Sequence, residues 1–196
     1  MQPADLNSPD FFRHSLRLAS PTIVVGHETA AALRLAHGTM TIPTVNVPQK
    51  LLTKGRRQLV FPMPSLSPSW FMQAFSDNRR HPLVETTSGL KEQPWFTTPA
   101  TPAWIGCDLH PCPNSGQEEK NGSLVPDAAT LTAVLLLALS QKLSPMNTNF
   151  ARFMSSTVTD DGLTVYLRFH NGRISYHAIQ RQEARLGLVL KVISVT

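Results

Sequence analysis

The amino-acid sequence predicts an α+β fold: a buried helix packed on an antiparallel β-meander sheet, preceded by a long proline-rich irregular N-terminal and middle region. Residues 127–143 are apolar nearly all round, which is typical of a buried helix. Two turn signals, Asp161-Gly162 and Asn171-Gly172, lie one strand apart and favour β-hairpins. Fifteen of the 16 prolines stand at or before Pro126, so we expect regular structure mainly after that residue.

The segment 1–61 is predicted to form a small strand–helix–strand unit that packs on the core. Thr22–Val25 is a short apolar run typical of a buried strand, and residues 28–37 are good helix formers that end before Gly38. Residues 41–48 alternate but contain two prolines, so they indicate an edge strand at best. Residues 58–61 then predict a strand that returns beside it.

The segment 62–126 is predicted to be an irregular linker, because it holds ten prolines in 65 residues. One short helix is expected near residues 68–80. Ser67 suits the N-cap of such a helix and Pro68 suits its first position.

The segment 127–196 is predicted to be the α+β core. Its helix, residues 127–143, ends before Pro145. Residues 188–195 are apolar on both faces except at Lys191 and Ser194, which indicates a strand inside a sheet. We therefore expect the helix to lie across a sheet of at least four strands.

The two turn signals also predict the pairing of the meander strands. A two-residue turn at Asn171-Gly172 sets Leu167 opposite Tyr176. A two-residue turn at Asp161-Gly162 sets Met154 opposite Phe169, and it likewise sets Val158 opposite Val165. All these residues then share one apolar face, as a sheet packed on a core requires. The polar face of the same strands comprises Thr164, Tyr166, Arg168, His170, Arg173, Ser175 and His177.

The net charge of +5 is concentrated in the segment 45–82, which contains six basic residues and one acid. The basic residues are Lys50, Lys54, Arg56, Arg57, Arg79 and Arg80. A concentrated basic segment can bind phosphates or an acidic partner protein, although the same residues are also common as a solvated surface. On the meander, Tyr166, Arg168, Arg173 and His177 would add stacking and phosphate contacts on the polar face.

Several classes of protein are disfavoured by the sequence. No apolar run reaches the length of a membrane span, and two cysteines do not make a secreted disulfide framework. A cytoplasmic location is therefore expected. His27-Glu28 lacks the second histidine of a zinc-protease motif because residue 31 is Ala31. The sequence contains no Gly-x-Ser-x-Gly elbow, and Gly26 alone makes no dinucleotide fingerprint.

A short loop holds the best candidate metal ligands. Cys107, His110 and Cys112 lie within six residues, and two thiolates with an imidazole are ligands that zinc prefers. The usual Cys-x₂-Cys spacing is missing, and an ordinary loop with two unremarkable cysteines is the alternative.

These observations lead to three functional hypotheses. The first is a non-catalytic binding or regulatory protein that uses a basic and aromatic surface on a nucleic acid or an acidic protein, without a cofactor. The second is a small zinc-binding protein or hydrolase-type enzyme centred on the cysteine–histidine loop. The third is a partly disordered chain with no defined biochemical activity.

Overall fold

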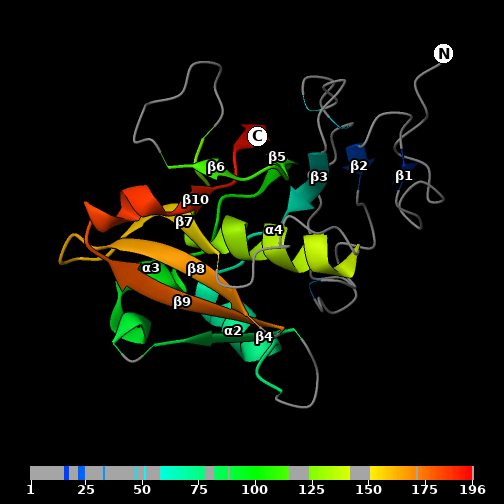
Figure 1. Ribbon diagram of the computed structural model, residues 1–196. Coiled ribbons are helices and arrows are strands. Elements are labelled where there is room, and N and C mark those ends of the chain that lie inside the picture. Colours follow the sequence, from blue (N-terminus) through cyan, green and yellow to red (C-terminus); the bar gives the residue numbers. More distant parts are fainter. Residues whose placement is uncertain are drawn as a thin grey trace.

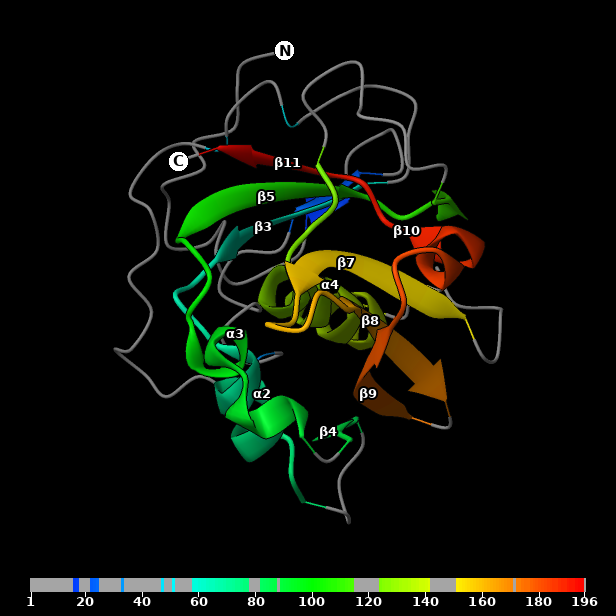
Figure 2. The same cartoon turned by 90° about the vertical axis from the view of Figure 1, so that its left-hand side faces the viewer.

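A computed structural model describes residues 16–17, 22–24, 33, 47, 51, 58–77, 82–87, 89–114, 124–141, 151–170 and 172–195. It confirms the predicted α+β class. The helix α4 (Ala128–Ser140) lies between two sheets (Figure 1). Figure 2 shows one sheet above this helix and the curved meander at its side.

The first sheet has five strands and covers one side of α4. Its strands lie in the order β1 (Leu16–Arg17), β2 (Thr22–Val24), β3 (Gln58–Met63), β5 (Ala103–Asp108) and β11 (Val192–Val195). β2 runs parallel to β3, whereas β5 is antiparallel to both β3 and β11. The strands predicted at residues 22–25 and 58–61 are thus present, as β2 and β3.

The second sheet has six strands and covers another side of α4. Its order is β4 (Leu83–Thr86), β9 (Arg173–Ile179), β8 (Thr164–His170), β7 (Arg152–Val158), β10 (Leu188–Val189) and β6 (Cys112–Pro113). The consecutive strands β7, β8 and β9 form the predicted antiparallel meander.

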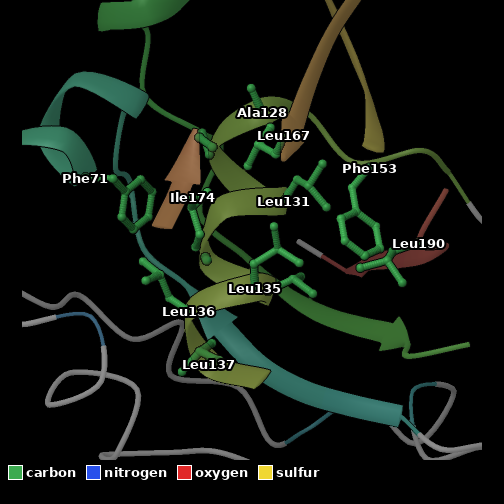
Figure 3. Packing of buried hydrophobic residues seen from close by; sticks show 14 of the residues in the cluster. Phe71, Ala128, Leu131, Leu135, Leu136, Leu137, Phe153, Leu167, Ile174 and Leu190 are labelled. Carbon is green, nitrogen blue, oxygen red and sulfur yellow. The ribbon is translucent and has the colours of Figure 1, made fainter. Parts of the chain in front are cut away.

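Helix α4 is buried along nearly its whole length, as its uniformly apolar sequence predicts. Asp127 caps it: the backbone N–H of Thr130 donates to Asp127 Oδ1 at 2.7 Å. Leu131 and Leu135 are fully buried and lie near Phe153 of β7 in the core (Figure 3). The helix ends at Ser140, three residues before the predicted end.

The segment 62–126 contains more regular structure than its prolines indicate. The predicted short helix begins at Pro68 as expected but is shorter than predicted, because α2 (Pro68–Ala74) ends at Ala74. Ser67 Oγ accepts from the N–H of Trp70 at 3.2 Å. β4, β5, β6, the 3-10 helix η3 (Leu90–Glu92) and the short helix α3 (Pro94–Thr97) also lie in this segment. Many prolines are compatible with these elements because of where they stand: Pro68 and Pro94 begin helices, a position at which proline's missing N–H is not needed.

The hydrophobic core joins residues from both sides of Pro126. Phe61, Phe71 and Ile105 belong to the same buried cluster as Leu135 and Ile174. The division into segments 1–61, 62–126 and 127–196 stays a prediction about folding units. The helix predicted over residues 28–37 and the edge strand over 41–48 lie outside the described residues, apart from Leu33 and Val47.

The predicted register is right for one hairpin and wrong for the other. β8 and β9 pair as expected, with Leu167 opposite Tyr176. Between β7 and β8, however, Met154 pairs with Tyr166 instead of Phe169, and Val158 pairs with Thr164 instead of Val165. The cause is twofold: the register shifts between Met154 and Val158, and the turn has a different length.

The turn between β7 and β8 is a three-residue loop rather than the predicted two-residue turn. The N–H of Gly162 donates to the carbonyl of Thr159 at 2.9 Å, and Gly162 has a φ of +81°. Leu163 then pairs with Thr159, because the Thr159 N–H donates to the Leu163 carbonyl at 2.9 Å. A turn followed by a left-handed glycine is the usual form of such a loop.

The predicted single strand over residues 188–195 is two strands in two sheets. β10 pairs with β7 and β6 in the six-stranded sheet, whereas β11 pairs with β5 in the five-stranded sheet. The chain passes from one sheet to the other at Leu190, which is fully buried. Val189, Leu190 and Val192 are buried, because the segment passes between two sheets that share one core.

Candidate functional site

The six-stranded sheet presents a polar face on the side away from α4. Phe153, Val165, Leu167, Ile174 and Tyr176 point inward, since all five are buried in the core cluster. Strand alternation therefore turns their neighbours outward. We call this set the outer face: Arg152, Tyr166, Arg168, Arg173, Ser175 and His177. It contains all four of the site residues that were predicted on the meander.

The centre of the outer face is a stacked pair of rings. Tyr166 on β8 and His177 on β9 are directly opposite each other, and their rings are stacked at 5.2 Å with an interplanar angle of 19°. On the other side of β8, the Arg152 guanidinium carbon lies 5.7 Å from the centroid of the Tyr166 ring. Guanidinium over a phenol ring at this distance is a cation–π contact.

His177 is held in a setting that favours its neutral form. Its Nε2 lies 2.8 Å from Ser175 Oγ, so the two side chains share a hydrogen bond. Partial burial lowers the pKa of His177 below the usual value, and the positive charges of Arg168 and Arg152 lower it further, while Glu85 acts in the opposite direction. At neutral pH the ring is therefore an uncharged stacking partner, and the charge of the outer face comes from its arginines.

The arginines are placed where they repel one another. Arg152 and Arg168 are cross-strand partners, and like charges directly opposite each other destabilise a sheet. Arg173 is half-exposed and pairs with Glu85 of β4 at 3.4 Å. Arg152, Arg168 and Arg173 therefore place three positive charges on the outer face, and Glu85 on the neighbouring β4 pairs with one of them.

One end of the outer face is covered by the chain itself. The 3-10 helix η4 (Glu183–Leu186) places Ala184 in a small cluster with Met154 and Val189. Gly187 allows this close approach, because a Cβ there would overlap the side chain of Met154. Tyr166 is partly buried and packs against this cluster. Arg152 and Arg173 are the exposed arginines of the outer face.

The basic residues predicted in the segment 45–82 form a separate set from the outer face. Lys50, Lys54, Arg56, Arg57, Arg79 and Arg80 all lie outside the described residues. Their participation stays a prediction.

The structure separates the predicted zinc ligands. Cys107 belongs to β5 in the five-stranded sheet and is fully buried, and burial raises the pKa of its thiol. Cys112 belongs to β6 in the six-stranded sheet. The side chain of His110 is 70% exposed, and its Nδ1 lies 3.1 Å from Asp108 Oδ1. Among the described residues, no group of three or more such side chains is placed to hold a metal ion.

An open cavity of about 360 Å³ lies between α3 and the start of α4. Trp95 lines it together with prolines, and the ionisable residues of its lining are Asp127 and Asp160. Because both are acids, this cavity does not extend the basic outer face.

Sequence reasoning missed two residues of this region, Arg152 and Glu85. The predicted β7–β8 register placed Met154 inward, and Arg152, two residues away, would have shared that inward side. Alternation with the apolar Phe153 was the signal that could have found it. Glu85 lies on β4, a strand in the segment expected to be irregular, so nothing local indicated its position beside Arg173.

Comparisons with known proteins identify no relative. No protein-family model matches the chain, and neither the curated proteins nor the solved structures contain a match to it. Within the part of the chain that the structure describes, no helix is both long and apolar enough to cross a membrane. The chemistry of the outer face is therefore the basis on which a function is proposed.

Proposed function

We propose that the protein is a non-catalytic nucleic-acid-binding protein that uses the outer face of its six-stranded sheet. The observation that carries this proposal is the Tyr166–His177 stack with Arg152 over the phenol ring and Arg168 opposite Arg152. Sheets that bind single-stranded nucleic acid carry basic side chains, which contact the phosphates, together with aromatic rings. The outer face contains both types of side chain.

The charge placement supports an anionic ligand in particular. Arg152 and Arg168 are cross-strand partners, so two positive charges start from neighbouring points of the outer face. Arg152 is exposed and its planar guanidinium offers several N–H donors, which suits the oxygens of a phosphate. An acidic protein segment would meet the same donors and is the outcome to consider if nucleic acid does not bind.

The test is a fluorescence-anisotropy titration of the full chain with a labelled single-stranded oligonucleotide at low salt, repeated at increasing salt. We expect binding that weakens with salt, and a double variant Arg152→Gln/Arg168→Gln that loses about tenfold or more in affinity. The plot of log binding constant against log salt concentration should also become less steep, by about 0.7 for each phosphate that the variant no longer neutralises.

The matched control is Arg185→Gln, because Arg185 is also exposed but lies in η4, outside the outer face. It removes a positive charge without touching the stacked rings and should change the affinity little. If the double variant and an Arg185→Gln/Arg181→Gln control lose the same factor in affinity, net charge alone drives binding. That result, or no binding at low salt, would overturn the proposal.

A further inference from the structure

The two faces of the Tyr166 ring are both covered by side chains of this protein. β8 lies between β7 and β9 in the sheet, and outward side chains stand roughly perpendicular to it. The His177 ring therefore covers the Tyr166 ring from the β9 side at 5.2 Å. The Arg152 guanidinium covers it from the β7 side, 5.7 Å from the centroid.

This arrangement leaves Tyr166 without a bare face for a nucleobase. A base that stacks on a protein aromatic ring needs such a face, and here it would first have to displace Arg152 or His177. His177 is itself tied to Ser175 through Nε2. Both faces of the Tyr166 ring are thus in contact with side chains of the protein itself.

The guanidinium of Arg152, in contrast, remains available while it is stacked. The guanidinium carbon lies 5.7 Å from the Tyr166 ring centroid, and the Arg152 side chain is exposed, so its N–H donors can reach a ligand. Tyr166 therefore positions Arg152 as a donor. The partner that fits planar donors near a second arginine, Arg168, is a phosphodiester oxygen rather than a base.

We infer that the outer face recognises the phosphodiester backbone and does not stack on bases, so that its ligand is a phosphodiester chain of any base sequence. This inference rests on the proposed function, since it concerns the same face. Tyr166 acts in it as a positioning residue for Arg152.

The experiment compares three single-stranded oligonucleotides of equal length with the full chain at low salt: oligo-dT, oligo-dA and an abasic phosphodiester chain. We expect their dissociation constants to agree within about threefold, with equal salt slopes, because the phosphate count is the same. An abasic chain that binds about tenfold or more weaker than both others would overturn the inference while leaving the proposed function intact. If none of the three binds, both fail.

Two variants separate positioning from stacking. Tyr166→Leu removes the platform under Arg152, so it should weaken binding of oligo-dT and of the abasic chain by the same factor. Tyr166→Phe keeps the ring and should restore the affinity for both. A Tyr166→Leu protein that loses affinity for oligo-dT but not for the abasic chain would show base stacking and overturn the inference. Unfolding curves of both variants confirm that they are folded.

Discussion

The phenol of Tyr176 on β9 and the hydroxyl of Thr132 on α4 lie 2.6 Å apart in the core, and both side chains are fully buried. Thr132 Oγ1 also donates to the carbonyl of Ala128 at 2.7 Å, so the phenol O–H is the donor to Thr132. This bond ties the buried helix to the sheet that carries the outer face.

The direction of that bond predicts an asymmetry between its two partners. Thr132→Val leaves the buried phenol donor without an acceptor and should lower the free energy of unfolding by about 2 kcal/mol. Tyr176→Phe removes the donor and should cost only about 1 kcal/mol. The double variant should be more stable than Thr132→Val alone, as measured by urea denaturation followed by tryptophan fluorescence. A double variant as unstable as the sum of the two would contradict a hydrogen bond between the two hydroxyl groups.

Stability should depend on pH through His177. Burial, aided by the charges of Arg168 and Arg152, lowers the folded-state pKa of His177 below the unfolded value of about 6.5. Above that pH both states are neutral and the full stability is present. As the pH falls below it, the unfolded state binds the proton first, so stability is lost until the folded-state pKa is passed.

The measurement is the difference in the free energy of unfolding between about pH 7.5 and pH 5.5, for the native chain and for His177→Gln. The difference should be smaller in the variant. An NMR titration of the imidazole gives the pKa directly, and Glu85→Gln should lower it further because Glu85 opposes the shift. A His177 pKa above the usual value would refute this account.

Gly187 is predicted to be required for the packing of η4 against the sheet. A Cβ at this position would overlap Met154 Sδ and Cγ and lie 3.3 Å from the carbonyl oxygen of Ala184. Met154 is almost fully buried and has little room to move. Gly187→Ala should therefore cost about 1–3 kcal/mol in chemical denaturation.

A double-mutant cycle with Met154 tests whether this side chain causes the cost of Gly187→Ala. Met154→Ala alone creates a cavity and is also destabilising. In the Gly187→Ala/Met154→Ala double variant the new methyl group has space, so the combined cost should be clearly less than the sum of the two single costs. If the cost of the double variant equals the sum of the two single costs, the methyl group of Gly187→Ala does not act through Met154.

Gly162 in the β7–β8 loop is predicted to matter through its backbone alone. Its φ is +81°, and nothing lies within 4 Å of where a Cβ would stand. Gly162→Ala should thus destabilise by about 1 kcal/mol from backbone strain. Gly162→Asn should cost less, because asparagine tolerates the left-handed region. A thermal unfolding midpoint that is higher for Gly162→Ala than for Gly162→Asn would contradict this account of the loop.

The candidate site was predictable where it depends on one hairpin. Tyr166, Arg168, Arg173 and His177 were placed together because strand alternation and a short turn set the β8–β9 register locally. Arg152 was missed, because the predicted two-residue turn set the wrong β7–β8 register: the loop has three residues and the register shifts between Met154 and Val158. The Ser175–His177 hydrogen bond and the lowered His177 pKa depend on burial and on neighbouring charges, which a sequence pattern does not contain.

The sequence by itself determined that a buried helix lies within residues 127–143 and that β7, β8 and β9 form a meander. Both conclusions rest on local periodicity. A helix without a polar face is stable only when it is buried, and strands of alternating apolar and polar residues are stable with one face on a core. Only the tertiary structure decided that β3 and β5 complete a second sheet over that helix and that residues 188–195 divide between the two sheets. Those pairings join residues far apart in the chain, so their stability comes from shared burial around α4, and no local pattern encodes it.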